Sequence, residues 1–503
     1  MKKILTLILF LGVLVSPLRA QTEDARRSHS PLVITGVTIV NVAAADPTDA
    51  LRPAQTVVIK GNRIAALGKA NQIKIPEGAR VIDATGKFLI PGLWDMHVHV
   101  SGERAAELSF PLFIVNGVTG VRDMGGASAD LGRLVQLRKE IARESLLGPR
   151  IIAAGPYLDG PRPGKSGHLR LSTPDEARQA VDSVKNQGWD FVKVHDWLSP
   201  TVYKAIAVEA KRLGLPMAGH VPISVSATEV SAAGQKSIEH LGNVLGGGLL
   251  VDCSTDEAAL RAKLREGVMK LDEQSLINTL RAPTVNRLIA TYSDQKAERL
   301  AALLARNGTC QVPTIYGTLW SNAFELDDSL HVNNAIVNDP RMKYLPAFAR
   351  ASSDSNKDPN PEHFTTEDVA AWKRQYRKQL ELIAILRRGG VQFMTGSDAE
   401  PSEGTIPGFS LQDELSFFVD AGFTPMEALQ AATRNPAKYL GLLDSLGTVE
   451  RGKIADLVLL DANPLDNIRN TQKISGVIVN GRLLTRKVLD GLLAKVEVAA
   501  KSK

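Results

Sequence analysis

The chain has 503 residues, of which 44% are hydrophobic and 23% charged, and its formal net charge is +6. This composition is ordinary for a soluble globular protein, and the length is sufficient to bury a large core. Half of the net charge belongs to Lys2, Lys3 and Arg19, so the remainder gives no electrostatic reason to expect nucleic acid as a partner.

The first 20 residues have the layout of a secretory signal peptide. Two lysines precede an apolar stretch from Ile4 to Val15, which is short for a membrane span, and Ala20 marks the expected cleavage site. We therefore predict an exported protein, periplasmic or secreted, without a stable membrane anchor after the signal is removed. An uncleaved anchor is the alternative.

Short β-strand patterns occur near both ends of the chain. Each is rich in Val and Ile and is bounded by turn residues; they cover residues 32–42, 55–68, 79–93, 452–464 and 474–484. The pairs Gly61-Asn62 and Asn480-Gly481 indicate hairpins. We predict one small β-sandwich domain built from both ends, residues 31–89 and 444–490.

The middle of the chain, residues 90–443, alternates short apolar segments with helical ones. Strand candidates lie directly before His97 and around residues 118–122, 150–154, 190–195, 216–220, 236–240, 309–314 and 391–397. Eight strands that alternate with helices predict a (β/α)8 TIM barrel, so the fold class is α/β.

Three longer segments complete this description. Thr424, Pro425 and Glu427 have the spacing of a capping box with proline at the first helical position, which predicts a helix over 424–442. Residues 252–308 look helical. Residues 317–375 are polar and irregular, and we expect them to cover the barrel mouth or to form a mobile lid. The two cysteines, Cys253 and Cys310, have no zinc-ligand spacing, and the sequence leaves open whether they pair.

Polar residues recur at the predicted strand ends. His97 and His99 are two residues apart, so both point to the same face at the C-terminal end of their strand, where barrel enzymes place their active sites. Other strands end at His220, His240 and Asp398. Most single histidines are structural or solvent-exposed, but this many ligand-type residues at successive strand ends predict a metal site. Imidazole and carboxylate ligands suit zinc or a similar divalent ion.

Side chains alternate between the two faces of a strand, and this alternation predicts that Lys193 points into the barrel. In the segment 189–196, Phe191, Lys193 and His195 alternate with Val192 and Val194, which suit packing under helices. An unpaired ammonium is costly to bury. The cost disappears if the amine is neutral and carries a carbamate that bridges two metal ions.

Several motifs together resemble the metal-dependent amidohydrolase superfamily over nearly the whole chain after the signal. The similar segments are "PGLWDMHVH", "NGVTGVRDMGG", "GQKSIEHL", "TGSDAE" and "GTVERGKIADLVLLD". They are typical of its imidazolonepropionase-like branch and most resemble binuclear Xaa-Pro-type dipeptidases.

The resemblance implies two divalent metal ions, with zinc as the default. His97, His99 and Asp398 would bind one ion, His220 and His240 the second, and a carboxylated Lys193 would bridge the pair. A bridging hydroxide would attack the scissile carbonyl, and Asp398 would carry the proton to the leaving nitrogen.

Five further residues receive roles at this site. His168 resembles a family position near the substrate, with a plain loop histidine as the alternative. Tyr157 and Arg162 lie in the same loop region and could hold a substrate carboxylate. Asp95 lies two residues before His97, so it points to the same face of the strand as the two histidines and could hold them in position. His195 could line the mouth or be a structural, hydrogen-bonded group.

We therefore predict an exported hydrolase that cleaves an amide or peptide bond in a dipeptide or N-acyl amino acid. Its partner is a small-molecule substrate, and a homo-oligomer is compatible with the sequence. The alternatives are a mononuclear cyclic-amide hydrolase, which has no use for an inward lysine, and a lactone or phosphoester hydrolase on the same site. A non-catalytic, metal-bearing binding module is the alternative from another class, and Asp398 argues against it.

Overall fold

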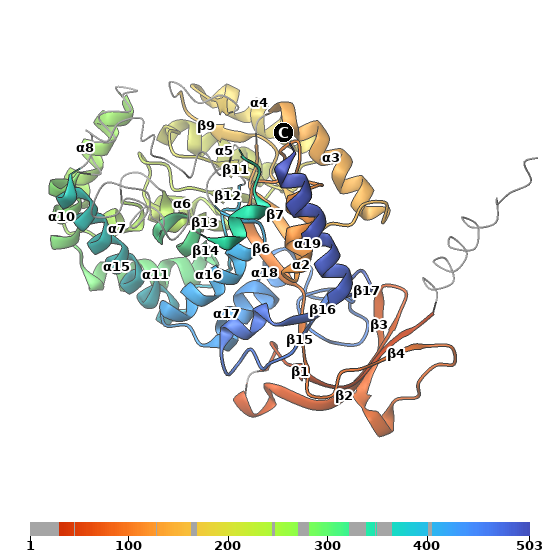
Figure 1. Ribbon diagram of the computed structural model, residues 1–503. Coiled ribbons are helices and arrows are strands. Elements are labelled where there is room, and N and C mark those ends of the chain that lie inside the picture. The colour runs from red at the N-terminus through yellow and green to blue at the C-terminus, as the bar shows by residue number, and fades with distance from the viewer. Residues whose placement is uncertain are drawn as a thin grey trace, which may run out of the picture.

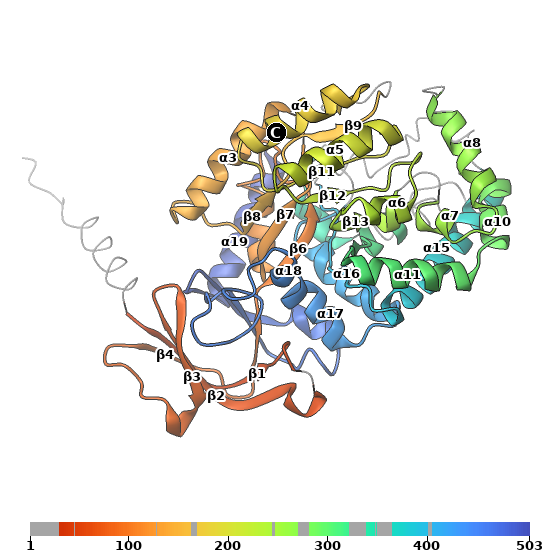
Figure 2. The ribbon, with the colours of Figure 1, turned by 180° about the vertical axis from the view of Figure 1, so that it is seen from behind.

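The computed structural model describes residues 30–44, 46–126, 128–161, 168–243, 247–269, 281–320, 339–347, 349, 365–400 and 405–502. The predicted signal peptide, Arg162 and much of the interval 317–375 lie outside these ranges. Figures 1 and 2 show a sheet at one end of the molecule and a larger body of helices and strands at the other.

Strands from both ends of the chain form one sheet. Its order is β17-β16-β15-β5-β1-β2-β3, with β4 paired to β1. The strands are β1 (Leu32–Val40), β2 (Leu51–Lys60), β3 (Arg63–Lys69), β4 (Arg80–Asp83), β5 (Phe88–Pro91), β15 (Leu457–Leu460), β16 (Ile474–Val479) and β17 (Arg482–Thr485). The two predicted hairpins are confirmed, because Gly61-Asn62 joins β2 to β3 and Asn480-Gly481 joins β16 to β17. The description of this unit as a sandwich stays a prediction.

Parallel strands alternate with helices through the middle of the chain. They are β6 (Leu93–Val98), β7 (Val118–Asp123), β8 (Arg150–Ala153), β9 (Tyr157–Asp159), β11 (Val192–Val194), β12 (Met217–Gly219), β13 (Ser237–Glu239) and β14 (Cys310–Val312); the short β10 (Leu169–Arg170) pairs with β9. Residues 391–399 close the ring: the amide of Met394 donates to Gln311 O (2.9 Å), and the amide of Met96 donates to Thr395 O (2.9 Å). The predicted barrel is thereby borne out.

Helices surround these strands (Figures 1 and 2). They are α2 (Ser109–Val115), α3 (Ser128–Ala142), α4 (Pro174–Asn186), α5 (Pro200–Arg212), α6 (Ala227–Ala232), α7 (Leu249–Asp252), α8 (Glu257–Met269), α10 (Ala282–Ala290), α11 (Asp294–Asn307), α15 (Thr366–Arg388), α16 (Phe409–Asp420), α17 (Pro425–Ala432), α18 (Arg434–Tyr439) and α19 (Arg486–Lys501). Short helical turns are η1 (Pro47–Asp49), η2 (Ala70–Gln72), η3 (His240–Gly242), η5 (Ile315–Trp320), η6 (Pro340–Tyr344) and η8 (Ile468–Gln472). The predicted capping box of α17 is present, since Thr424 Oγ1 accepts from the amide of Glu427 (3.2 Å).

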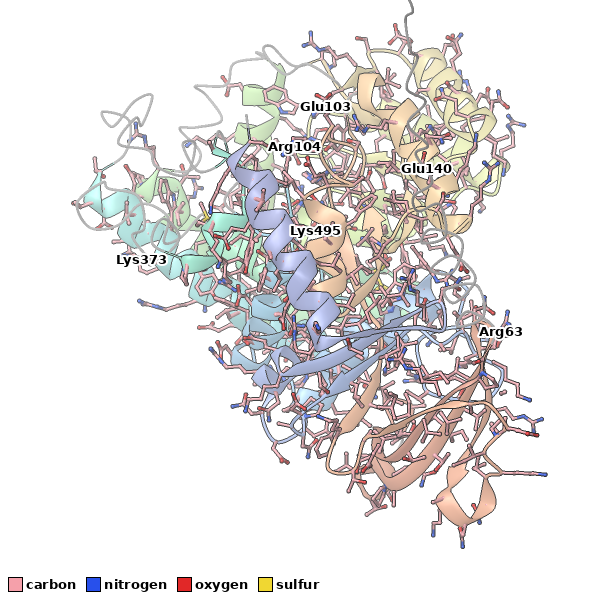
Figure 3. All side chains as sticks on the ribbon, turned by 45° about the vertical axis from the view of Figure 1, so that its right-hand side comes forward. Arg63, Glu103, Arg104, Glu140, Lys373 and Lys495 are labelled. Carbon is pink, nitrogen blue, oxygen red and sulfur yellow. The ribbon has the colours of Figure 1, made fainter. Side chains whose placement is uncertain are left out.

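Two helices correct the sequence-based boundaries. α15 begins at Thr366, inside the interval 317–375 that we expected to be irregular, because Thr365 and Asp368 form a capping box in a mostly polar segment. α19 begins at Arg486, inside the range expected to be β structure. Its buried Leu489, Val496 and Ala500 face the molecule, whereas Lys495 lies on the outer side (Figure 3).

The inside of the barrel is packed rather than hollow. Trp94, Met96, Val312 and Met394 form one buried cluster, and Met124, Ala154, Phe191 and Ala218 form another. Side chains therefore fill the barrel below the strand ends, as in other barrels of this type. Cys253 and Cys310 are buried free thiols. None of the helices in the described ranges is both long and apolar enough to cross a membrane.

Candidate metal centre

The structure brings six predicted ligand residues together at the C-terminal ends of the barrel strands. They are His97 on β6, His99 just after it, Lys193 on β11, His220 after β12, His240 after β13 and Asp398 in the closing segment. Two of them have left-handed backbone, with φ of +54° at His240 and +56° at Asp398. Such strain in residues other than glycine is concentrated at functional sites.

A closed ring of aromatic side chains surrounds this point. The distances between successive ring centroids are His99–His97 5.4 Å, His97–His240 4.5 Å, His240–His220 4.8 Å, His220–His195 4.1 Å, His195–His168 4.9 Å, His168–Tyr157 4.6 Å and Tyr157–His99 5.8 Å. The predicted metal ligands His97, His99, His220 and His240 make one part of the ring, called the first arc. Tyr157, His168 and His195 make the other part, the second arc.

Each histidine of the first arc is held through Nδ1. The partners of Nδ1 are Glu239 Oε2 for His97 (2.9 Å), Gly125 O for His99 (2.9 Å), Asp196 Oδ1 for His220 (2.7 Å) and Thr314 Oγ1 for His240 (2.7 Å). Carboxylate and carbonyl oxygens only accept, so Nδ1 of the first three carries the proton in the neutral ring. The lone pair then lies on Nε2, which is the arrangement that metal-binding histidines use.

The separations around Asp398 fit a bound cation. Asp398 Oδ1 lies 3.4 Å from His97 Nε2 and 3.3 Å from His99 Nε2. With Zn–N and Zn–O distances near 2.1 Å, two ligand atoms of a tetrahedral site lie about 3.4 Å apart. Ligand atoms of His97, His240 and Asp398 also lie within 4.8 Å of one another. The donor set and its spacing therefore suit a divalent metal.

Lys193 is a buried amine without a close counter-ion. It is 1% exposed, and within the described part of the chain no carboxylate lies within 4 Å of its Nζ. Burial lowers its pKa to about 8, although Glu239 and Asp398 act in the opposite direction. The side chain is therefore neutral much more readily than an ordinary lysine.

The other charges of the site also favour cation binding. Burial lowers the pKa of His97 and His220 well below the usual range and that of His240 to about 4. Burial opposes ionisation of Asp398, but His240 and His99 outweigh it and hold the pKa of this carboxyl well below its usual range. Burial also opposes protonation of His99, but Asp398 raises its pKa to about 9. The neutral imidazoles of His97, His220 and His240 beside an ionised carboxylate are ready-made ligands, whereas His99 would release a proton on binding a metal.

A buried ion pair supports the first arc from below. Arg122 Nη2 donates to both carboxylate oxygens of Glu239 (2.9 Å each), and Arg122 Nε donates to Met96 O (2.6 Å). Ser237 Oγ donates to Glu239 Oε1 (2.6 Å). Glu239 is thus fixed where it meets His97. Asp95, which we expected to support the histidines, accepts a hydrogen bond from the amide of His97 (3.3 Å). It also accepts from the amide (2.9 Å) and hydroxyl (2.5 Å) of Ser397, and so connects His97 to the segment that carries Asp398.

Two of the three predicted substrate-contact residues lie on the second arc. Tyr157 Oη is 2.9 Å from His99 Nδ1, and His168 Nδ1 is 3.0 Å from Asp159 Oδ2. Arg162 lies outside the described residues. The sequence-based reasoning missed Asp159, Asp196 and Glu239. The last two adjoin a predicted site histidine in the sequence, which was a usable signal.

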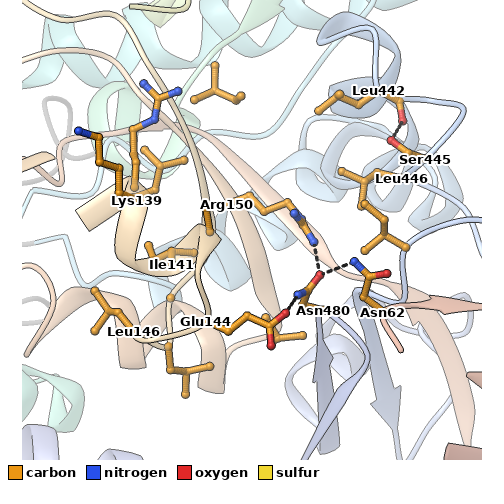
Figure 4. A pocket seen from close by; sticks show the side chains of 18 of the residues that line it. Asn62, Lys139, Ile141, Glu144, Leu146, Arg150, Leu442, Ser445, Leu446 and Asn480 are labelled. Carbon is orange, nitrogen blue, oxygen red and sulfur yellow. Dashed lines mark hydrogen bonds between the residues drawn. The ribbon is translucent and has the colours of Figure 1, made fainter. Parts of the chain in front are cut away.

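A separate cavity of about 860 Å³ lies at the opposite end of the barrel strands (Figure 4). Ile141, Leu146, Arg150, Leu442 and Asn480 are among its lining residues. It contains none of the six predicted ligands. Because active sites of such barrels lie at the C-terminal strand ends, this cavity is not the candidate catalytic site.

Comparisons with known proteins agree with this geometry. The profile described as "Amidohydrolase family" matches residues 88–484. The chain belongs to the amidohydrolase family. This amidohydrolase is accordingly a metal-dependent hydrolase that acts on carbon–nitrogen bonds.

Individual relatives are more distant. The amidohydrolase is 24% identical to ochratoxinase from Aspergillus niger, over 91% of this chain and 89% of the relative. It is also 24% identical to imidazolonepropionase from Legionella pneumophila, over 84% of this chain and 91% of the relative. Among solved structures, a Xaa-Pro dipeptidase with bound methionine in the active site aligns with a TM-score of 0.61 at 22% identity, covering 91% of this chain and 100% of that one. A bottromycin amidohydrolase aligns at 0.69 and 19% identity, covering 97% and 94%. These structures show the same fold.

Proposed function

We propose that this amidohydrolase hydrolyses an amide or peptide bond in a dipeptide or N-acyl amino acid, using two divalent ions, with zinc as the expected metal. His97, His99 and Asp398 would hold one ion and His220 and His240 the other. A carbamate on Lys193 would bridge them. The observation that carries the proposal is a buried lysine beside four histidines held through Nδ1, with no carboxylate of the described residues within 4 Å of the lysine.

The bound ions would polarise the scissile carbonyl and would make water a strong nucleophile at neutral pH. The remaining work falls to the protein's own groups. Asp398 Oδ2 accepts a hydrogen bond from Thr318 Oγ1 (3.0 Å), which orients the carboxylate. An ionised carboxylate at this place is suited to accept a proton and to deliver it to the leaving nitrogen.

The substrate class is supported by the relatives' own names. One aligned structure is a Xaa-Pro dipeptidase and another is a prolidase complexed with N-methylphosphonate-L-proline. The second arc of the ring offers polar groups on the side away from Asp398, as an amino-acid substrate requires. A mononuclear cyclic-amide hydrolase is the alternative, because imidazolonepropionase is also a relative.

Metal content tests the binuclear proposal directly. We expect close to two metal ions per chain in protein produced with zinc and bicarbonate, falling to one or none in Lys193→Ala. Lys211→Ala, an exposed lysine on α5, is the control and should keep both ions. The measurement is elemental analysis, followed by a screen of a dipeptide library. One ion per chain, unchanged in Lys193→Ala, would remove the bridging role and favour the cyclic-amide alternative.

We also propose that the protein is exported, on the pattern of its first 20 residues. Expression of the full chain in a bacterial host should yield a mature protein that begins after Ala20 and that fractionates with the periplasm or medium. N-terminal sequencing checks both points. A full-length chain retained in the cytoplasm would contradict the proposal.

A further inference from the structure

Glu414 is a buried carboxylate that binds the backbone of another element. It lies on α16 and is 0% exposed. Its Oε1 accepts a hydrogen bond from the amide of Ile315 (2.9 Å), and its Oε2 accepts one from the amide of Tyr316 (2.7 Å). These two residues begin the π-helical turn η5, and the first amides of a helical turn have no partner within it. A side chain from a different helix therefore caps η5.

η5 and the residue before it bring two hydroxyl groups to the metal centre. Thr314 places its Oγ1 2.7 Å from His240 Nδ1. Thr318 donates from Oγ1 to Asp398 Oδ2 (3.0 Å). The two hydroxyls also contact each other, at 2.9 Å. Because His240 and Asp398 are predicted ligands of different ions, one short segment contacts a ligand of each.

The backbone of η5 lies directly against the segment that carries Asp398. A Cβ atom on Gly317 would lie 2.1 Å from Ser397 O and 3.4 Å from Asp398 Cβ, so only glycine allows this approach. Thr314 has left-handed backbone, with φ of +48°, as His240 and Asp398 do. Strain of this kind persists only where the surroundings hold the chain, and π-helical turns are frequent at functional sites.

The contacts of Glu414 and those of the two hydroxyls depend on each other. Without the carboxylate, the amides of Ile315 and Tyr316 would lose their acceptor, and a buried amide is costly to leave unpaired. η5 would then shift until water or another acceptor reached them. Such a shift would move Thr314 and Thr318, and with them the contacts of the two metal ligands.

We propose that Glu414 is a positioning residue of the metal centre. It holds η5 through the first two amides of the turn, and η5 in turn fixes Nδ1 of His240 and Oδ2 of Asp398. One carboxylate outside the centre thereby sets a ligand of each ion. The inference deepens the proposed function and rests on it, because it takes His240 and Asp398 as ligands of the two ions.

Zinc affinity of Glu414→Gln is the first measurement, by competition with a chromophoric chelator. Glutamine keeps the shape, but its amide nitrogen would face the N–H of Ile315 or Tyr316, so one hydrogen bond is lost. Loss of a group that orients a metal ligand typically costs about 10- to 100-fold in affinity, and we expect a loss of that size. Glu298→Gln, exposed on α11, is the matched control and should bind zinc as wild-type protein does.

A double-mutant cycle separates positioning from a general structural role. Thr314→Val and Thr318→Val together remove both hydroxyls and should weaken zinc binding, whereas Thr318→Ser keeps its hydroxyl and should keep the affinity. Because Glu414 acts through η5, adding Glu414→Gln to the two valines should lower the affinity by less than about threefold more. Losses that add fully would overturn the inference.

A second variant covers the case in which Glu414→Gln does not fold, which circular dichroism would show. Glu414→Asp keeps both acceptors on a side chain that is shorter by one methylene, so η5 must shift to stay bound, and zinc affinity should again fall. Loss of the fold in both variants would make Glu414 a structural residue and would overturn the inference.

Turnover of a dipeptide library distinguishes this inference from the proposed function. A coupled loss of zinc affinity in protein that hydrolyses no amide would mean that only the proposed function fails. Amide hydrolysis together with unchanged zinc affinity in Glu414→Gln would overturn only the role of Glu414. Absence of zinc binding by wild-type protein would overturn both.

Discussion

Asp398 combines several constraints in one residue. Its left-handed backbone, its contacts with His97 and His99 and its hydrogen bond from Thr318 all place the carboxylate at one point. Gly396, two residues earlier, is required for this approach, because a Cβ there would lie 2.8 Å from His97 Cβ. The left-handed backbone of Asp398 is therefore maintained by its surroundings.

Asp398→Asn tests the proton-transfer role. Asparagine keeps the shape and one ligand oxygen but cannot accept a proton, so we expect kcat to fall by about 10²- to 10⁴-fold. Steady-state kinetics with elemental analysis measures the effect on protein that retains its metal. Asp490→Asn, exposed on α19, serves as the control. Undiminished activity in metal-loaded Asp398→Asn would rule the role out.

Glu239 should control metal affinity without touching the metal. Glu239→Gln weakens the contact with His97 Nδ1, and the loss of such a supporting group typically costs 10- to 100-fold in metal affinity. It also leaves Arg122 buried without its partner charge, which costs about 3–5 kcal/mol of stability. Competition with a chromophoric chelator measures the affinity, and denaturant unfolding measures the stability.

A double variant separates these two effects. Arg122→Met combined with Glu239→Gln removes the orphaned charge, so stability should recover in part while metal affinity stays low. If affinity recovers together with stability, Glu239 acts on the fold and has no specific effect on His97.

At the scale of elements, the strands were predictable and some helices were not. Hairpin turns such as Gly61-Asn62 depend on the local backbone preferences of their residues, so they can be predicted from the sequence alone. α15 was missed in part because polar residues dominate its first turns, and its buried side is visible only once α10 and α11 lie against it. The order of strands and helices can be predicted from local sequence, whereas the first and last residues of a helix depend on the elements that pack against it.

The same distinction applies to the candidate site. Alternation along the strands predicted inward positions for His97, His99, Lys193 and Asp398. Position at a strand end predicted His220 and His240. The supporting carboxylates could not be assigned to particular histidines, because Glu239 ends β13 and yet its carboxylate contacts the His97 ring on β6. That pairing exists only after the barrel closes.

α19 should stabilise the whole barrel through one face. Leu489 is buried in the main core, and Val496 and Ala500 pack with Leu108 and Leu112. Leu489→Ala should therefore lower the free energy of unfolding by about 2–4 kcal/mol. Val498→Ala on the same helix, where the residue is 71% exposed, should change it by less than about 0.5 kcal/mol. Denaturant unfolding checks both, and similar values for the two variants would show that α19 is not docked as described.

At the scale of the whole molecule, the terminal sheet and the barrel are joined by continuous structure. β5 pairs with β15 and leads through Pro91 and Gly92 directly into β6. Asp456, just before β15, fixes the junction: its carbonyl accepts from the amide of Gly92 (2.7 Å), and its side chain accepts from Arg150 Nε (2.7 Å) and from the amide of Asn480 (2.6 Å). The metal centre lies at the far end of the same strands.

This arrangement predicts that sheet and barrel unfold together. Asp456→Ala leaves the amide of Asn480 and the guanidinium of Arg150 without their acceptor, so we expect a loss of about 1–3 kcal/mol in the free energy of unfolding, with metal content unchanged. Lys87→Ala removes an exposed ion pair with Asp461 inside the sheet alone and should cost less than about 1 kcal/mol. Calorimetry should show one transition in all three proteins, shifted downward most in Asp456→Ala. Two separate transitions, with only the first affected by Asp456→Ala, would mean that the sheet is an independent domain and that its contacts at the base of the barrel do not stabilise the strands that carry the site.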